Sequence, residues 1–168
     1  METSPVEHTA HDLKSAFIAA MRRFAATVTI VTVCPKGERS GMTATAVASV
    51  STDPPAVLVC VNRAASIRAN LEIKTPFCIN ILATSHAAVS AAFGGKLTGA
   101  ARFSVGNWDE DPEGRVFLKD AQANLFCVVD STLDYGTHTV VIGKVDAIRL
   151  HGAVDPLLYA NGKYIRMS

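Results

Sequence analysis

The chain has 168 residues, of which 49% are hydrophobic and 18% charged, and its formal net charge is +1. A chain of this size and composition can bury a core and is most simply one globular domain. Near-zero charge without a long basic cluster argues against nucleic acid as the main partner. The longest strictly apolar run, 56–61, is too short to span a membrane, and the N-terminus lacks a secretory pattern. We therefore expect a soluble cytoplasmic protein.

Cysteine and histidine patterns exclude the metal sites that can be recognised from spacing. The cysteines are scattered and form no Cys-x-x-Cys motif: Cys34, Cys60, Cys78 and Cys127. Free thiols inside apolar runs behave as small buried hydrophobes, and a cytoplasmic location disfavours a structural disulfide. The five histidines form neither an HExxH motif nor a close group with cysteine, so no metal site is predicted.

The N-terminal segment predicts a tail followed by a helix. Residues 1–10 are polar, and we expect them to be flexible. Asp12 can cap the helix that follows. The apolar residues of this helix recur at helical spacing: Leu13, Phe17, Met21 and Phe24. A single domain is then expected over 11–168.

Most of the remaining chain has the pattern of β-strands. They are expected at 27–34, 39–50, 56–62, 77–82, 121–133, 138–150 and, briefly, near 163–166. Short helices are expected at 66–72 and 85–93, the second ended by Gly94-Gly95, and 95–116 is expected to be a long loop. Many strands without strict βαβ alternation favour a closed antiparallel β-barrel with peripheral helices over a doubly wound sheet.

The strand expected over 39–50 is unusual because small and hydroxylated residues occupy positions where bulky apolar ones normally pack. Alternate residues share one face of a strand, and the hydroxylated ones here are Thr43, Thr45, Ser49 and Ser51. Such a face leaves room for a ligand, and hydroxyls with backbone N–H groups suit a phosphate and a flat, hydrogen-bonding ring. An edge strand facing water is the alternative that the local pattern leaves open.

Three further segments could bind an anion or a cofactor. Ser66 follows Asn62 and Arg63 where a strand ends, and it could cap the next helix or help bind an anion. Arg102 could bind a phosphate, although a solvated loop arginine is the alternative. His138 opens a strand, where its imidazole could contact a redox cofactor or the electron donor, and a structural role is the alternative.

Several motifs occur in one order along 15–166: Gly41-Met42-Thr43-Ala44-Thr45-Ala46-Val47, Asp53-Pro54-Pro55, Asn80-Ile81-Leu82, Phe93-Gly94-Gly95, Arg102-Phe103, Gly136-Thr137-His138 and Pro156-Leu157-Leu158-Tyr159. In this order they resemble the flavin reductase-like family of FMN-binding split β-barrels, the small components of two-component flavin-dependent monooxygenases. Within that family the chain is most similar to reductases that serve 4-hydroxyphenylacetate, chlorophenol and pyrimidine-ring oxygenases. Many relatives carry Asp in place of Thr137, which leaves an acidic orientation of His138 in doubt.

The resemblance implies a mainly β, antiparallel Greek-key split barrel that forms a homodimer, with flavin in a groove at the interface. It implies hydride transfer from NADH or NADPH to FMN or FAD, and diffusion of reduced flavin to a separate monooxygenase. Two alternatives are a flavin-binding protein without turnover and a reductase of another acceptor, such as a cobalt corrinoid.

The resemblance also implies roles for individual residues. Those implied to contact or lie beside the flavin ring and ribityl chain are Thr43, Ala44, Thr45, Ala46, Ser49 and Val50. Those implied to border the isoalloxazine or close the groove are Cys60, Val61, Asn62, Arg63, Phe93 and Gly94. Ser66 and Arg102 are candidates for the phosphate. The nicotinamide is implied to lie at His138, the candidate catalytic residue, with Tyr159 and Tyr164 flanking it.

Overall fold

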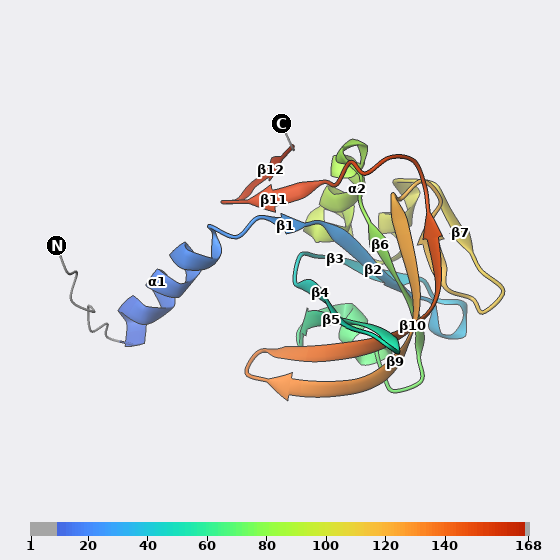
Figure 1. The fold of residues 1–168 in the computed structure, drawn as a ribbon, viewed down its shortest axis with the longest axis horizontal. Helices are drawn as coiled ribbons and strands as arrows, with labels where there is room; N and C mark the ends of the chain where they lie inside the picture. The colour runs from blue at the N-terminus through green and yellow to red at the C-terminus, as the bar shows by residue number, and fades with distance from the viewer. Residues whose placement is uncertain (1–9, 167–168) are drawn as a thin grey trace.

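The computed structural model describes residues 10–166, so the tail expected over 1–10 lies outside the described residues except for Ala10, which is helical. Its body is one antiparallel sheet in the order β3-β2-β6-β9-β10-β5-β4 (Figure 1). The strands of this sheet are β2 (Thr29–Val33), β3 (Ser40–Ala44), β4 (Val47–Thr52), β5 (Pro55–Asn62), β6 (Pro76–Ile81), β9 (Ala123–Tyr135) and β10 (His138–Leu150). These elements confirm most of the strands expected from the sequence.

The two end strands of the sheet, β3 and β4, are consecutive in the chain and separated only by Thr45 and Ala46. Within residues 10–166 no ladder joins them, so the expectation of a closed barrel is wrong and the barrel is split at this point. The hydrogen bonds explain the break: the Thr29 hydroxyl donates to the Ala44 carbonyl (2.8 Å), whereas the Ala46 carbonyl accepts from the Cys60 N–H (3.0 Å). The chain thus leaves β2 and joins β5 between these residues.

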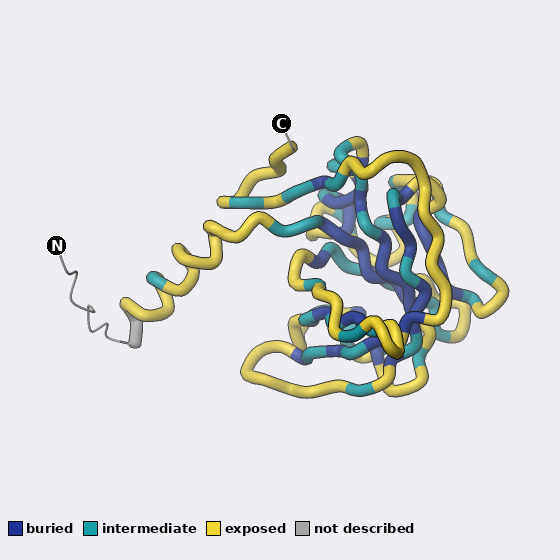
Figure 2. The backbone as a smooth tube through the Cα atoms, in the orientation of Figure 1, coloured by how far each residue is buried: buried dark blue, intermediate teal, exposed yellow. Residues whose placement is uncertain are grey.

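The core lies between the two halves of the folded sheet, where Figure 2 shows buried backbone in dark blue. Its largest cluster contains β-branched residues from both halves together with Phe77, which is fully buried. A second cluster lies beneath α2 (Ala87–Ala91) and includes Leu82, Phe93 and Leu118. Burial of these apolar side chains is the main stabilising contribution to the fold.

Helix α1 (Ala10–Met21) stands away from the sheet, and its described side chains are mostly exposed (Figures 1 and 2). The helix begins two residues before Asp12, which therefore lies in the first turn and is not the cap that the sequence suggested. An acidic residue there is still favourable beside the N-terminal end of the helix dipole. Phe24 lies beyond the end of the helix, contrary to its assignment to the helical face.

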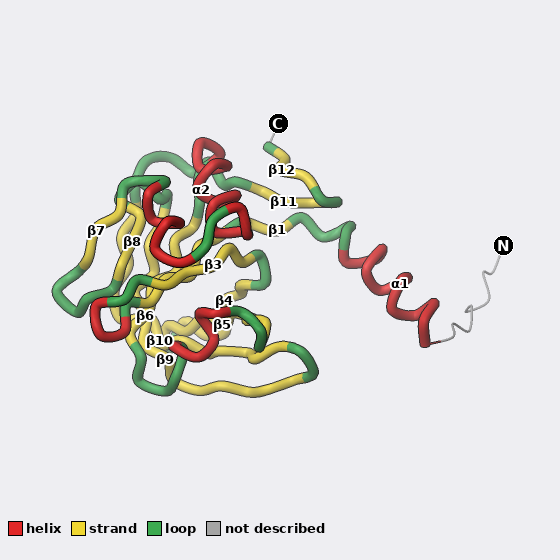
Figure 3. The backbone as a smooth tube through the Cα atoms, turned by 180° about the vertical axis from the view of Figure 1, so that it is seen from behind, coloured by secondary structure: helices red, strands yellow, loops and turns green. Residues whose placement is uncertain are grey.

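The shorter elements surround the sheet on the side of β3, where Figure 3 shows several helical segments. The helix expected over 85–93 consists of a 3₁₀ turn (Thr84–His86), α2 and a π-helix (Ala92–Lys96), and the one expected at 66–72 is a 3₁₀ helix (Ser66–Asn70). The expected loop contains a 3₁₀ helix (Gly99–Ser104) and β7 (Trp108–Glu110), which pairs with β8 (Val116–Leu118). A small sheet contains β1 (Ala26–Thr27), β11 (Leu158–Ala160) and β12 (Lys163–Ile165). Within the described chain, every helix is too short or too polar to cross a membrane.

Candidate functional site

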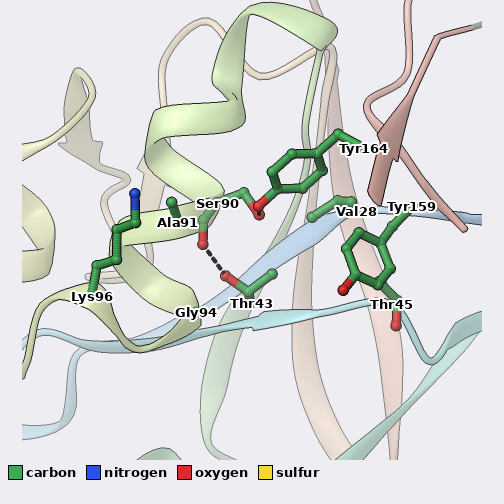
Figure 4. Close-up of a pocket in the computed structure, with 9 residues that line it drawn as sticks. All are labelled: Val28, Thr43, Thr45, Ser90, Ala91, Gly94, Lys96, Tyr159 and Tyr164. Carbon is green, nitrogen blue, oxygen red and sulfur yellow. Dashed lines mark hydrogen bonds between the residues drawn. The ribbon is translucent and has the colours of Figure 1, made fainter. Parts of the chain in front are cut away.

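A pocket of about 380 Å³ lies between β3, the α2 segment and the β11–β12 hairpin (Figure 4). It is lined by Val28, Thr43, Thr45, Ser90, Ala91, Gly94, Lys96, Tyr159 and Tyr164. This volume is within the range of small-molecule sites. The pocket brings together five of the residues selected from the sequence, which come from opposite ends of the chain: Thr43, Thr45, Gly94, Tyr159 and Tyr164.

Ser90 joins the three walls of this pocket through hydrogen bonds. Its carbonyl accepts from the Thr43 hydroxyl (2.8 Å), and its own hydroxyl accepts from the Tyr164 hydroxyl (2.8 Å). Ser90 is only 1% exposed, and its two bonds fix β3 and β12 against α2 from this buried position. The rings of Tyr159 and Tyr164 pack edge to face with centroids 5.7 Å apart, and they present aromatic surface beside Thr45.

The sequence interpretation missed Ser90 and Lys96. Lys96 is an exposed cation at the pocket, and its position directly after two glycines was a signal that could have been used. Ser90 gave no such signal, because it lies within an alanine-rich helical pattern and its role depends on contacts with distant strands. Gly94 lines the pocket between them, and a Cβ there would meet only the Thr43 hydroxyl, at 3.8 Å. The pocket wall is therefore open at Gly94.

A larger groove of about 1150 Å³ adjoins this pocket and shares Thr45 and Tyr159 with it. Two other selected residues, Ala46 and Ser49, also line it. Its remaining wall is mostly apolar and includes α1 residues such as Phe17, which is 62% exposed. The split between β3 and β4 thus opens onto a wide apolar surface.

Three selected residues have side chains in the core, so any contact that they make with a ligand would come from their backbone atoms: Ala44, Val61 and Phe93. Ala44 points inward because its neighbours Thr43 and Thr45 face the pocket. Val61 belongs to the inner face of β5. The Phe93 ring packs edge-on against Phe103, with centroids 5.0 Å apart, and it does not line the pocket described above.

Arg102 and Ser66, the candidates for the phosphate, are not part of the pocket. The Arg102 guanidinium donates to the Gly41 carbonyl (2.7 Å) and to the Leu97 carbonyl (3.0 Å), so it ties its own 3₁₀ helix to β3. Ser66 is the first residue of its 3₁₀ helix, and Ala65 occupies the cap position. The capping role expected for Ser66 is therefore wrong.

A second group of selected residues lies at the end of the β9–β10 hairpin. His138 pairs in register with Asn62 of β5, and the half-buried Cys60 lies opposite Val140. The His138 ring is exposed, and its Nδ1 lies 2.9 Å from the hydroxyl of Thr137. This hydroxyl, rather than a carboxylate, orients the imidazole here. Val50 is also exposed, on β4.

Beneath His138, the carboxylate of Asp134 accepts a hydrogen bond from the Thr139 hydroxyl. This bond, followed by the charges of Arg63 and Arg68, lowers the pKa of Asp134. None of the residues at this hairpin end lines the pocket or the groove.

Among the described residues, His, Cys, Asp and Glu form no cluster of three that could hold a metal ion.

The family described as "Flavin reductase like domain" has a model that matches residues 21–168. The chain belongs to this family. Among curated relatives it is 40% identical to the reductase component of the FADH(2)-dependent resorcinol hydroxylase of Rhizobium sp. (strain MTP-10005), over 90% of this chain and 86% of that protein. It is 38% identical to the NADH-dependent FMN reductase RutF of Variovorax paradoxus (strain S110), over 90% of this chain and 84% of that protein.

The fold is also that of solved flavin reductases. The NADH:FAD oxidoreductase SgcE6 of Streptomyces globisporus C-1027, solved in complex with NAD and FAD fragments, superposes with a TM-score of 0.86. The two sequences are 26% identical, and the match covers 97% of this chain and 98% of the other. Since the neighbours are split-barrel flavin reductases, the mainly β split-barrel fold expected from the sequence is confirmed.

Proposed function

We propose that this member of the flavin reductase family oxidises NADH or NADPH, reduces FMN or FAD, and supplies reduced flavin to a separate monooxygenase. The observation that carries the proposal is the match to the family over 21–168. Two relatives support the finer description, because one is named as the reductase component of a hydroxylase and the other as an NADH-dependent FMN reductase. The NAD and FAD fragments bound to SgcE6 support the pair of cofactors.

The pocket fits a flavin nucleotide in the chemistry of its walls. Gly94 leaves open space beside Thr43, which admits a flat ring. Lys96 offers a positive charge for a phosphate, and the Tyr159–Tyr164 pair offers aromatic surface for stacking. When bound, flavin and nicotinamide supply the hydride chemistry themselves. The protein's own contribution is to bind the rings, orient them and exclude water.

His138 is proposed to lie against the nicotinamide donor. Its ring is exposed, and Thr137 restrains its orientation. The neighbouring Asn62 and Arg63 offer an amide and a guanidinium to a polar ligand at the same hairpin end. If His138 has this role, His138→Ala should weaken use of NADH more than binding of flavin, as measured by the KM for NADH and the Kd for flavin.

A homodimer is proposed because each copy exposes both an apolar helix and an apolar groove. Helix α1 exposes Leu13, Phe17 and Ile18, and it stands away from its own sheet, which leaves this face uncovered. An apolar face of this kind is typical of an interaction site, and reciprocal contacts between two identical surfaces are the usual form of a dimer. Sedimentation of the wild type should give a dimer, and Phe17→Asp should shift it toward monomer. Ile73 is also exposed (60%) but lies outside the helix and the groove, so Ile73→Asp should leave the dimer unchanged. A monomeric wild type would contradict the proposal.

A direct assay tests the proposed reaction. Purified protein is mixed with NADH or NADPH and with free FMN or FAD, and oxidation of the nicotinamide is followed by its absorbance. We expect oxidation that requires both flavin and protein. If neither donor is oxidised with either flavin, the proposal fails, and flavin retained through gel filtration would then indicate a binding protein. A faster reaction with a corrinoid than with flavin would indicate another acceptor.

A further inference from the structure

We propose that Asp134, Thr139 and Arg68 form a clamp that holds the end of the β9–β10 hairpin and thereby positions His138. The inference rests on the proposed function, because that function gives His138 its place beside the electron donor. The three residues act by fixing the place of His138, and none of them is proposed to contact the electron donor itself.

The clamp joins three separate elements through one buried hydroxyl. Thr139 of β10 is fully buried, and its hydroxyl donates to Asp134 Oδ1 on β9. The same hydroxyl oxygen accepts from Arg68 Nε of the 3₁₀ helix at 2.7 Å. Arg68 Nη2 lies 3.7 Å from Asp134 Oδ1, which closes the triangle. Water has little access to the Thr139 hydroxyl itself, although the Asp134 carboxylate is half exposed, so few water molecules compete for the bridging position.

The hairpin needs such a restraint because β9 loses its second neighbour before the hairpin ends. Strand β6 pairs with β9 only as far as Val128, so the last residues of β9 pair with β10 alone. Tyr135, at the end of β9, is 81% exposed. Without side-chain contacts, this end would move more freely than the rest of the sheet. Asp134 supplies the contact that ties β9 to the 3₁₀ helix.

His138 responds to the clamp because it directly precedes Thr139 in β10. Successive side chains point to opposite faces of a strand, so fixing Thr139 on the inner face fixes where His138 stands on the outer face. Cross-strand register supports this geometry, since Thr139 pairs with Asp134 while His138 pairs with Tyr135. Displacements of about 1 Å at a reacting group can reduce a rate roughly a hundredfold.

Arg63 is a peripheral member of the same region. Its Nε lies 4.0 Å from Asp134 Oδ2, and its Nη1 donates to the Gly136 carbonyl at 3.5 Å. The side chain of Arg63 is 58% exposed, whereas that of Arg68 is 24% exposed. Both arginines place a positive charge near Asp134, but Arg68 also bonds the bridging hydroxyl, so Arg68 belongs to the clamp and Arg63 lies at its edge.

The test replaces the bridging hydroxyl and keeps the shape of the side chain, in Thr139→Val. We expect kcat for NADH-driven flavin reduction to fall roughly ten- to a hundredfold with little change in KM for flavin. Thr139→Ser, which keeps the hydroxyl, should retain most of kcat. Thr132 lies on β9 outside the clamp, where it pairs with Val141, so the same chemical change in Thr132→Val should leave kcat unchanged.

A second readout follows the imidazole of His138 by NMR in labelled protein without cofactors, with the signal assigned from His138→Ala. We expect one sharp resonance in the wild type and in Thr139→Ser, and a broadened or doubled one in Thr139→Val. If Thr139→Val does not fold, Arg68→Met provides the same two readouts from a half-buried position. Wild-type kcat together with an unchanged His138 resonance would overturn the clamp. A wild type without flavin reduction would overturn the proposed function instead, and the NMR comparison would still decide the clamp.

Discussion

Gly41 allows β3 to lie against the aromatic cluster behind the pocket, and Gly41→Ala tests this packing. A Cβ at this position would lie 2.7 Å from Phe93 Cε1 and 3.0 Å from the Val31 carbonyl oxygen. Phe93 cannot move aside easily, because its ring packs against Phe103 at 5.0 Å and Trp108 at 5.1 Å. The added methyl group therefore displaces either a buried ring or the backbone of β3.

The magnitude follows from the cost of overpacking a dense core, which is about 1–3 kcal/mol. For a chain of this size, each kcal/mol lowers the Tm by about 2–4 °C, so we expect a decrease of roughly 2–12 °C. The shift has a second consequence, because the Gly41 carbonyl accepts the hydrogen bond from Arg102. Thermal unfolding and urea unfolding at one fixed protein concentration measure the loss.

Two variants make the experiment specific. Gly94→Ala adds the same methyl group where the nearest atom is 3.8 Å away, so it should be neutral or slightly stabilising. Phe93→Leu removes the ring atom that is contacted, and in a double-mutant cycle it should recover about 0.5–3 kcal/mol of the loss. If Gly41→Ala is as stable as the wild type, or if Phe93→Leu recovers nothing, the packing argument is refuted.

Three further predictions follow from the structure. Gly94→Leu should raise the KM for flavin at least about tenfold without lowering the Tm, because the new leucine side chain would enter the pocket. An unchanged KM would show that flavin binds elsewhere. Arg115→Met should lower the free energy of unfolding in urea by roughly 2–4 kcal/mol, because it leaves the mostly buried carboxylate of Asp111 without its partner. Arg39→Met removes an exposed ion pair and should lower it by under about 1 kcal/mol. Equal losses in the two variants would contradict this reasoning. Burial raises the pKa of the Cys127 thiol to about 12, so the folded state keeps a proton that the unfolded state releases. The free energy of unfolding should then fall as pH rises above about 9, by up to about 1.4 kcal/mol per pH unit, and Cys127→Ala should show a smaller slope; parallel slopes would exclude this origin.

Local sequence patterns were sufficient for most strands because alternation and β-branched composition reflect the strand's own geometry. The range expected for β10, 138–150, agrees with the structure, as does that for β5 to within one residue. The pattern failed at 39–50, where one strand was expected and two occur. Thr45 and Ala46 have no local feature that breaks a strand. The chain divides there because Ala44 bonds to β2 and Ala46 bonds to β5.

The sequence by itself determined the mainly β, antiparallel class and the small, hydroxylated character of the strand containing Thr43. Its local pattern predicted a closed barrel, and the split was expected only from the resemblance to a family. The sequence could not determine which residues near Thr43 face a ligand, since that depends on which side of each strand packs against the core. Tertiary contacts placed Phe93 in the core, engaged Arg102 with two backbone carbonyls, and brought Lys96 to the pocket. They also joined Thr43, Ser90 and Tyr164 through hydrogen bonds, although these residues are far apart in the chain. Composition and periodicity report local geometry, whereas a binding site depends on contacts between segments that only the folded chain brings together.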